Sequence, residues 1–412
     1  MSPDSPPDTT ALLREASALA PVLTALRQDL HRIPEIGLDL PQTQQRVLTA
    51  LEGLGLEITT GTGLSSVVAV LRGARPGPAV LLRGDMDALP VTEDSGEPFT
   101  SEHHGAMHAC GHDLHVAGLV GAAHLLVARR DEIAGSVVLM FQPGEEGPHG
   151  ARLMIEEGVL DAAGERVVAA YGVHVVSSMV PNGVVTARPG TAMAASDQLY
   201  VTVQGRGGHG SMPHLAADPV TVAAEIVLAL QTVVTRQLDA HDPVVVSVGR
   251  LAAGTVDNVI PATAELDATV RTFSPEQHAV VPGRLTRAVE HIAAAHGLTA
   301  DVVYERGYPV TVNDPTEVTR AERVTTALLG PDRYVTAQRP VSGAEDFSYV
   351  LQEVPGAFLF LGATPQDADP ATAPYNHSPR ARFDDSVLPV AAAVLAGLAL
   401  DRLAQGGSPT VG

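Results

Sequence analysis

The chain contains a single cysteine, which lies between two histidines in the stretch MHACGHDLH, residues 107–115. One thiol cannot form an internal disulfide, so Cys110 is either a buried apolar filler or a group that ligates or attacks. Thiolate and imidazole are common ligands of zinc and of neighbouring transition metals. The spacing of Cys110 and His112 therefore indicates a possible metal site, which needs further ligands from the rest of the sequence.

Acidic and histidine residues also follow three short apolar runs, at the point where each run ends. Residues 79–83 run into Asp85 and Asp87, residues 136–141 into Glu145 and Glu146, and residues 167–173 into His174. Such runs are typical of buried strands, and the carboxyl ends of strands border the ligand crevice of an open α/β sheet. We therefore expect these side chains to lie close together. A distant segment, residues 375–379, offers one more imidazole, that of His377.

Five of these residues are candidate metal ligands: Cys110, His112, Glu146, His174 and His377. Five ligands are too many for one catalytic ion that must keep an open position, and they suit two ions that share one ligand. Thiolate, imidazole and carboxylate together favour zinc, manganese or cobalt, and nickel is also compatible. Each residue type taken alone is more often structural, so it is their joint occurrence at strand ends that favours the metal site.

Two carboxylates beside the candidate ligands remain for other roles. A metal ion lowers the pKa of a bound water, and a neighbouring carboxylate can take its proton and pass it to a leaving amine. We assign Glu146 to the metal and Glu145 to this general-base role. Asp87 is expected to hold the ring of a ligand histidine in the right orientation.

The elements that must position these residues alternate between helices and short strands. Apolar residues recur at helical spacing over residues 10–33 and 42–54, and residues 112–130 are long enough for a further helix between two of the strands. This alternation predicts the α/β class, with a mostly parallel sheet and helices on both of its faces.

The pattern changes near residue 189. From residue 198 to residue 304 the order is β-α-β-β-α-β, which is typical of a ferredoxin-like α+β sandwich, and afterwards the α/β pattern returns. We therefore expect a catalytic domain of residues 1–188 and 305–412, interrupted by an inserted domain of residues 189–304.

Composition limits the classes of binding partner and the cellular compartment that we expect for this chain. The chain of 412 residues is long enough for two domains, and its hydrophobic content of 45% is that of a globular protein. A net charge of −21 argues against nucleic acid and anionic membrane, because both require a basic surface. We find no run of 18 uncharged apolar residues that predicts a membrane span, and no secretory signal. With one cysteine, the simplest compartment is the reducing cytoplasm.

Taken together, the motifs resemble those of a known family. In chain order they are LHRIPEIGL (30–38), GDMDALP (84–90), MHACGHD (107–113), PGEEG (143–147), GVHV (172–175), GRGGHGSMPH (205–214), NVIP (258–261), SGAEDF (342–347) and NHSP (376–379). This set is similar to the amidohydrolase branch of the aminoacylase/carboxypeptidase-type dinuclear metallopeptidases. That branch includes hippurate hydrolases, N-acyl-amino-acid deacylases and plant auxin-conjugate hydrolases, and the resemblance covers nearly the whole chain.

The resemblance implies two divalent ions, often manganese or zinc, bridged by Cys110. It implies that His112 and His174 bind one ion, and that Glu146 and His377 bind the other. It agrees with the roles given above to the general base and to the orienting carboxylate. The reaction that it implies is cleavage of the amide of an N-acyl amino acid, hippurate-like, to a carboxylic acid and the free amino acid.

The resemblance also implies roles for the inserted domain. In similar enzymes this domain is a lid that dimerises, and a histidine of its GGHGSMPH stretch reaches the active site of the partner chain. Here that histidine is His209, with His214 the less favoured choice, and it would stabilise the oxyanion of the transition state. Asn258 and Arg271 match lid positions that bind a substrate carboxylate, for which an arginine fork is a natural partner. We therefore expect a homodimer or a higher homo-oligomer.

Two other functions are also compatible with the sequence. A dipeptidase or carboxypeptidase could use the same dinuclear site, and cleavage of dipeptides but not of acylated amino acids would distinguish it. A metal-dependent binding module without catalysis is the more distant alternative. Glu145 argues against that module, because a site that only bound metal would need no second carboxylate beside the ligand.

Overall fold

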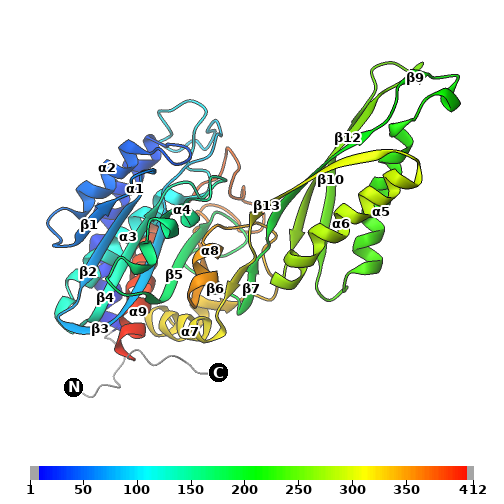
Figure 1. Cartoon of the computed structure of the whole chain (residues 1–412). Coiled ribbons are helices and arrows are strands. Elements are labelled where there is room, and N and C mark those ends of the chain that lie inside the picture. The colour runs from blue at the N-terminus through cyan, green and yellow to red at the C-terminus, as the bar shows by residue number, and fades with distance from the viewer. Residues whose placement is uncertain (1–8, 406–412) are drawn as a thin grey trace. The chain divides into compact units, whose positions relative to one another are not determined.

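The computed structural model describes residues 9–405, which form two compact units (Figure 1). Unit 2 consists of Thr191–Thr311 and Pro340–Ser348, and the other described residues form unit 1. Unit 2 therefore starts close to the expected residue 189 but extends past residue 304, and it takes in a second, later segment.

Backbone pairing explains both differences from the expected boundaries. The last strand of unit 2, β13 (Thr299–Tyr308), stays paired with β8 (Ser196–Gln204) as far as Tyr308. The later segment belongs to unit 2 because the backbone N–H of Ala194 donates to the carbonyls of Val341 and Gly343. Neither of these pairings leaves a periodic signal in the sequence.

Unit 1 is built on one eight-stranded sheet with the order β1-β2-β4-β3-β5-β16-β6-β15. Its strands are β1 (Glu57–Thr60), β2 (Val67–Arg72), β3 (Arg75–Asp85), β4 (Ala134–Gln142), β5 (Val167–Val176), β6 (Val185–Ala187), β15 (Tyr334–Thr336) and β16 (Gly356–Gly362). The four central strands β4, β3, β5 and β16 run parallel, and antiparallel pairs occur toward the edges. Every residue of β16 is buried, as expected for a central strand covered on both faces.

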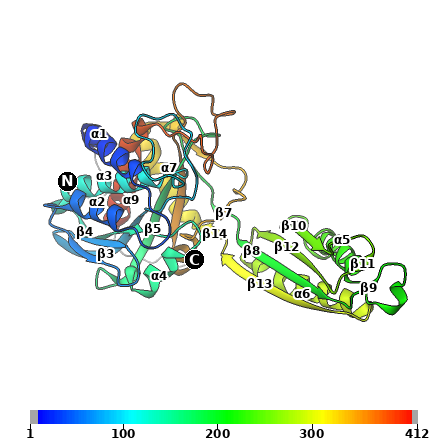
Figure 2. The same cartoon turned by 90° about the horizontal axis from the view of Figure 1, so that it is seen from above.

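Helices cover both faces of this sheet (Figure 2). They are α1 (Thr9–Arg32), α2 (Pro41–Leu51), α3 (His112–Val127), α4 (Gly150–Glu156), α7 (Pro315–Leu329), α8 (Ser348–Glu353) and α9 (Leu388–Ala404). On one face, α1, α3 and α9 pack in one core with Val67, Ala69 and Leu71 of β2. On the other face, α4 faces Val68 and Val70, the alternate residues of the same strand. The predicted α/β architecture is confirmed.

Helix α3 carries a metal-ligand candidate at its first residue and is buried on nearly all sides. It packs closely against α9 because two glycines face that helix. A Cβ atom placed on Gly121 would lie 2.7 Å from Ala392 Cβ and 2.8 Å from Leu23 Cδ1. The absence of a side chain at Gly121 therefore sets the distance between α3 and its neighbours, and with it the position of the metal-ligand candidate.

Replacing Gly121 with Ala is expected to destabilise the protein by about 1 kcal/mol. The overlap costs about 1–3 kcal/mol, which outweighs the gain of about 1 kcal/mol from the better helix propensity of alanine. Gly283, in helix α6 (Pro275–Ala295) of unit 2, is the matched control because no atom lies within 4 Å of its added Cβ, so Gly283→Ala should be stabilising. Urea unfolding midpoints check both variants, and a higher midpoint for Gly121→Ala would contradict the close α3–α9 contact.

Unit 2 contains a four-stranded antiparallel sheet with two helices packed on one face. Besides β8 and β13, its elements are α5 (Pro219–Gln237), β10 (Val244–Ala253), β12 (Thr263–Thr272) and α6 (Pro275–Ala295). Their order along the chain is β-α-β-β-α-β, and the strand order in the sheet is β10-β12-β8-β13. At one end of unit 2, β9 (Gly208–His209) pairs with β11 (Val259–Ile260), and we call this pair and its flanking residues, 208–215 and 256–260, the hairpin tip (Figure 1).

Two helices among the described residues are long and apolar enough to cross a membrane by length and composition alone. They are α5 and the segment Asp385–Ala404, which contains α9. The second is mostly buried in the core of unit 1, and α5 packs Val222, Ile226 and Leu230 onto the sheet of unit 2. Both helices therefore have a packing role within their own unit.

Candidate metal centre

The predicted site residues of unit 1 gather at the carboxyl ends of its central strands. Strand β3 ends at Asp85, the turn with both glutamates follows the end of β4, and His174 lies near the end of β5. His112 opens α3, which begins beside the same edge of the sheet. Strand β5 runs on to Val176, so His174 lies within the strand and is held by its pairing with Phe360 of β16. The parallel sheet thus places side chains from distant segments at one edge.

Each of the five candidate ligands lies within 4 Å of at least one other. Cys110 Sγ is 3.4 Å from His174 Nε2 and 3.3 Å from His377 Nε2. Glu146 Oε1 is 3.2 Å from His377 Nε2 and 3.9 Å from His112 Nε2. Ligand atoms of one tetrahedral ion, bonded at the usual lengths, stand about 3.3–3.8 Å apart. The spacing of these side chains therefore suits metal coordination.

The ligand atoms divide into two sets that share one member. Cys110, His112 and His174 form one triad, and Cys110, Glu146 and His377 form the other. The other ring nitrogens are engaged, since His112 Nδ1 donates to the carbonyl of Asp87 and His174 Nδ1 to that of Val175. Among the described residues, His112 Nε2 is buried without a hydrogen bond, although the Asp85 carboxylate lies 3.3 Å from it. This nitrogen and the thiolate that belongs to both sets are donors that would suit two divalent cations.

Asp87 holds the site together in a different way from the one expected. Its carboxylate accepts the backbone N–H of Glu145 (2.9 Å) and of Glu146 (3.0 Å). The ring of His112 donates to the backbone carbonyl of Asp87 at 2.8 Å, whereas the Asp87 carboxylate is 3.5 Å from the same nitrogen. Asp87 therefore orients the ligand histidine mainly through its main chain, and its carboxylate fixes the turn that carries both glutamates.

Glu145 lies inside the site with its side chain almost fully buried. It is 6% exposed, and its carboxylate groups with His112 and Glu146. Glu146 points to the ligand triad described above, so the two adjacent glutamates serve different atoms. This is the arrangement that a metal ligand and a neighbouring general base require.

A buried charge network behind the ligands was not predicted from the sequence. Asp85 accepts a hydrogen bond from His115 Nδ1 (2.5 Å) and an ion pair from Arg83 (2.7 Å), while the Val175 N–H donates to His115 Nε2. Burial alone would raise the pKa of Asp85, but the charge of Arg83 and the hydrogen bond donated by His115 hold this pKa well below its usual value. One feature of the sequence could have indicated the contact between His115 and Asp85: His115 lies three residues after the candidate ligand His112, on the same helix face.

A second buried network ties α1 to the start of α3. His31 lies between two carboxylates, with Nδ1 2.7 Å from Asp113 and Nε2 3.1 Å from Glu93. Asp113, which follows the ligand His112, is also paired with Arg27 at 2.9 Å. Burial alone would lower the pKa of His31, but the charge of Asp113 and the hydrogen bonds to both carboxylates raise it above its usual value. His31 therefore stays protonated to a higher pH than an exposed histidine does.

This raised pKa predicts a pH-dependent stability. The stabilising contribution of charged His31 is fully present below its unfolded pKa of about 6.5 and is lost as the pH rises through the folded value. We expect His31→Gln to cost about 3 kcal/mol near pH 6, and less as the pH rises through the raised folded pKa. Urea unfolding of the metal-free protein across this range measures the difference. His296→Gln, which removes an exposed pair with Glu225, should show almost no effect. A cost for His31→Gln that stays constant with pH would contradict a charged His31.

The hairpin tip carries two of the three predicted site residues of unit 2. His209 is exposed on β9, opposite Val259, and the backbone N–H of Gly210 donates to the carbonyl of Asn258. His209 Nδ1 accepts the backbone N–H of Ser211 at 3.2 Å, which leaves its proton on Nε2. The less favoured His214 is also exposed, in a short 3₁₀ turn nearby. His209 thus presents an outward N–H donor, as an oxyanion contact requires.

Arg271 lies at the opposite end of unit 2 from Asn258, contrary to the expectation that both bind one carboxylate. It is near the end of β12, half-buried, and its guanidinium donates to Ser196 Oγ; burial lowers its pKa. Eight residues of extended strand separate it from Thr263 at the other end of β12, a distance of about 27 Å. Within one chain, Asn258 and Arg271 cannot hold the same group.

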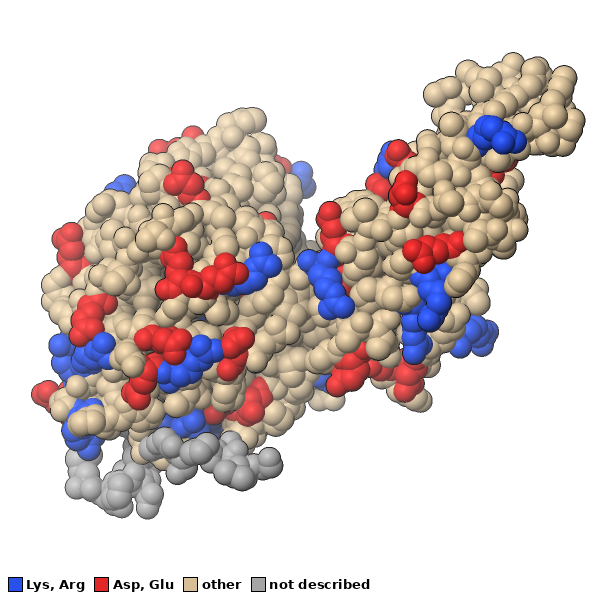
Figure 3. Space-filling view, in the orientation of Figure 1, with Lys and Arg blue, Asp and Glu red and all other residues tan. Residues whose placement is uncertain are grey.

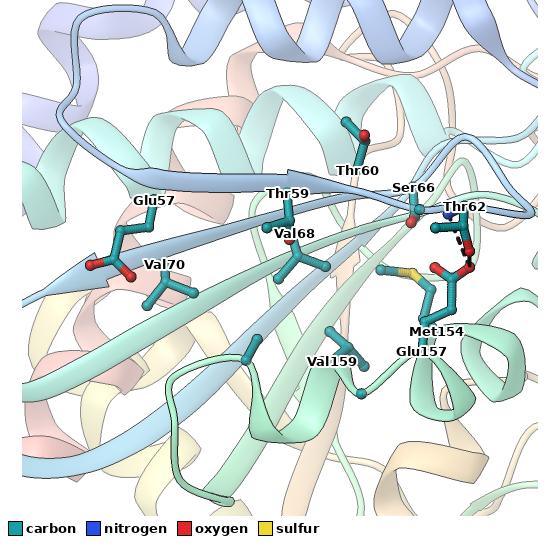
Figure 4. A pocket seen from close by; sticks show the side chains of 13 residues that line it. Glu57, Thr59, Thr60, Thr62, Ser66, Val68, Val70, Met154, Glu157 and Val159 are labelled. Carbon is teal, nitrogen blue, oxygen red and sulfur yellow. Dashed lines mark hydrogen bonds between the residues drawn. The ribbon is translucent and has the colours of Figure 1, made fainter.

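A cavity of about 460 Å³ lies elsewhere in unit 1, between the β1–β2 edge and α4 (Figure 4). None of the predicted site residues lines it. The Glu157 carboxylate at this cavity accepts the N–H and O–H groups of Thr62 and the N–H of Gly63. Its acidic group is thus engaged by the chain itself, and the cavity is separate from the metal-ligand candidates.

Residues 81–401 match the peptidase family M20/M25/M40. The chain is 40% identical over 379 residues to thermostable carboxypeptidase 2 of Saccharolobus solfataricus, and this alignment covers 91% of the chain and 94% of that protein. It is 37% identical over 379 residues to N-acetylcysteine deacetylase of Bacillus subtilis, covering 92% of this chain and 96% of that protein. Its structure resembles that of the Bacillus subtilis YXEP protein, which is described as a dinuclear metal-binding peptidase of the M20 family. The TM-score is 0.81 at 34% sequence identity, and the match covers 94% of this chain and 99% of that one.

These similarities confirm the resemblance drawn from the motifs. The matched span begins in β3 and ends in α9, so it contains all five candidate ligands and the whole of unit 2. The relatives named above are hydrolases that act on amide bonds, and the similar structure has a dinuclear metal site. On these grounds the chain belongs to the M20/M25/M40 peptidase family and is a metal-dependent hydrolase of that family.

Proposed function

We propose that the protein hydrolyses the amide bond of N-acyl amino acids, hippurate-like, to a carboxylic acid and the free amino acid. The observation that carries this proposal is the buried carboxylate of Glu145 beside two ligand triads that share Cys110. A relative at 37% identity, N-acetylcysteine deacetylase, bears a name of this reaction class.

The chain's own residues account for the proton transfers. Two divalent cations, manganese or zinc with cobalt or nickel as alternatives, would polarise the amide carbonyl and make a water molecule more acidic. Glu145 takes the proton of the attacking water and passes it to the leaving nitrogen. Asp87 keeps this carboxylate in place, because it accepts the backbone N–H groups of both glutamates.

A second copy of the chain completes the proposed site. The hairpin tip exposes four apolar side chains: Met212 (46%), Leu215 (64%), Val256 (56%) and Val259 (51%). Figure 3 shows few charged side chains on the drawn face of this part of unit 2, while acidic and basic groups are interspersed elsewhere on that face. An exposed apolar tip with an outward imidazole supports docking onto another copy, as a homodimer or higher homo-oligomer. Arg271 of one copy and His209 with Asn258 of another would then hold the substrate.

A dipeptidase or carboxypeptidase reaction at the same centre is the second candidate. It is favoured by the 40% identity to a protein named thermostable carboxypeptidase 2. Both reactions need the same water activation, and they differ in what the site accepts on the acyl side of the cleaved amide. The compartment expected for either reaction, the cytoplasm, stays a prediction.

A substrate panel tests the two functions. Release of free amino acid is measured from N-acetyl, N-benzoyl and longer N-acyl amino acids and from dipeptides, with Mn²⁺ or Zn²⁺ added and with a chelator. Chelator-sensitive cleavage of acylated amino acids is the expected result. Cleavage of dipeptides alone would move the protein to the peptidase function, and a rate unchanged by the chelator would contradict the metal centre.

A further inference from the structure

We propose that Asn376 is a positioning residue of the metal centre, whose amide joins the chain segments of three ligands and lies beside the Cys110 sulfur. Asn376 Nδ2 donates to the backbone carbonyls of Cys110 (3.2 Å) and Val175 (3.0 Å), and it is 3.8 Å from Cys110 Sγ. Cys110 is the ligand shared by both triads, Val175 follows the ligand His174, and Asn376 precedes the ligand His377. One side chain therefore contacts the segments of three ligands.

The orientation of this amide follows from its other hydrogen bonds. Asn376 Oδ1 accepts the backbone N–H of Ser177 at 2.9 Å. A flipped amide would set NH₂ against that N–H and the oxygen against two carbonyls, so only one orientation satisfies every group. The N–H donors of Asn376 therefore face the sulfur and carbonyl oxygens, where a donor can stabilise a thiolate.

Besides the contacts of its ring with Cys110 and Glu146, His377 depends on hydrogen bonds of its own segment. Its backbone has φ of +71°, a left-handed conformation that residues other than glycine rarely adopt. Its side chain is 55% exposed, so packing does not fix the ring. Besides the Asn376 amide, the His377 N–H donates to the carbonyl of Ala109 at 2.8 Å. An unfavourable backbone conformation persists only where the surrounding contacts determine it, and here these are hydrogen bonds to the Cys110 segment.

The test replaces Asn376 with Asp, which has the same shape but no N–H donor. In the Asn376→Asp variant the new carboxylate would face the sulfur and two carbonyl oxygens. We expect metal affinity to fall about 10–100-fold and the thiolate-to-Co²⁺ charge-transfer absorption of the Co²⁺-loaded protein to shift. The readouts are Co²⁺ titration of the metal-free protein followed by absorption, and Zn²⁺ competition.

The chain offers a matched control in Asn313, which is fully buried in unit 1 and has the same bonding pattern. Asn313 Nδ2 donates to the carbonyls of Arg188 and Phe358, and its Oδ1 accepts the Phe358 N–H. Asn313→Asp should destabilise the fold while leaving Co²⁺ affinity and absorption unchanged. If both variants bind Co²⁺ like the unmodified protein, or both lose affinity equally, Asn376 has no specific role at the centre.

Two further comparisons separate the possible causes of a failure. Should Asn376→Asp fail to fold, Asn376→Ser removes the same contacts without adding charge and is expected to show a smaller loss of affinity in the same direction; unchanged affinity would overturn the proposal. The inference rests on the metal centre of the proposed function. Failure of the unmodified protein to bind Co²⁺ would overturn that centre itself, whereas unmodified binding with unchanged variants would overturn only the role of Asn376.

Discussion

Replacing Glu145 with Gln is expected to lower kcat by about 10²–10⁴-fold or more, while the protein keeps its metal. A glutamine side chain does not ionise, so the Glu145→Gln variant cannot take a proton from the attacking water. The backbone N–H that Asp87 accepts from residue 145 is unchanged, so the turn should keep its shape. Metal content and kcat, measured on the same preparation with the best substrate of the panel, check both halves of the prediction.

Two matched variants show whether this effect belongs to the site. Glu157→Gln changes a glutamate of unit 1 that is held by Thr62 and Gly63 beside the separate cavity, and it should leave kcat unchanged. Glu146→Gln removes a member of a ligand triad and should lower both metal content and kcat. A Glu145→Gln protein that loses its metal would make Glu145 a ligand, and one that keeps full turnover would exclude it as the base.

Four of the five ligands could be predicted because they lie at or near the ends of recognisable elements. Cys110 and His112 lie at the start of a helix, Glu146 follows a buried strand, and His174 lies near the end of another strand, so the topology of a parallel sheet brings them to one edge. His377 has no such local signal, because it lies in an irregular segment and reaches Cys110 across 267 positions of the chain. It was the resemblance to a family that gave it a defined partner.

The hydrogen bonds that support the ligands could not be predicted from the sequence, for a different reason. Asp85 with Arg83, and Asn376 with Ser177, are hydrogen bonds whose partners depend on how strands and loops meet in three dimensions. No periodicity encodes such a pair. The separation of Asn258 and Arg271, in contrast, could have been predicted from the sequence. The two residues are thirteen positions apart, and most of the positions between them form an extended strand, so the two side chains are too far apart to bind one carboxylate.

That separation bears on how the active site is completed. If the hairpin tip of one chain supplied His209 to a second copy, His209→Ala should lower kcat about 10²–10³-fold through loss of one oxyanion donor. The Glu145→Gln variant has an intact tip but no base, and the His209→Ala variant has an intact base but no oxyanion donor. Each variant therefore lacks one group that the other variant still has. A dimer with one copy of each variant would contain one site with both groups.

A mixture of the two variants, exchanged by mild denaturation and refolding, is therefore expected to regain roughly a quarter of the original activity. Half of the dimers would then be mixed, and one of the two sites in each would combine Glu145 of one chain with His209 of the other. A mixture of Glu145→Gln with Glu146→Gln is the negative control, because both defects lie in unit 1 and no mixed site is complete. Activity that stays at the mean of the two variants would place His209 on its own chain's site or outside catalysis. Because the tip and Arg271 lie about 27 Å apart within unit 2, an Arg271 that binds substrate at a recovered site would have to come from a different chain than His209.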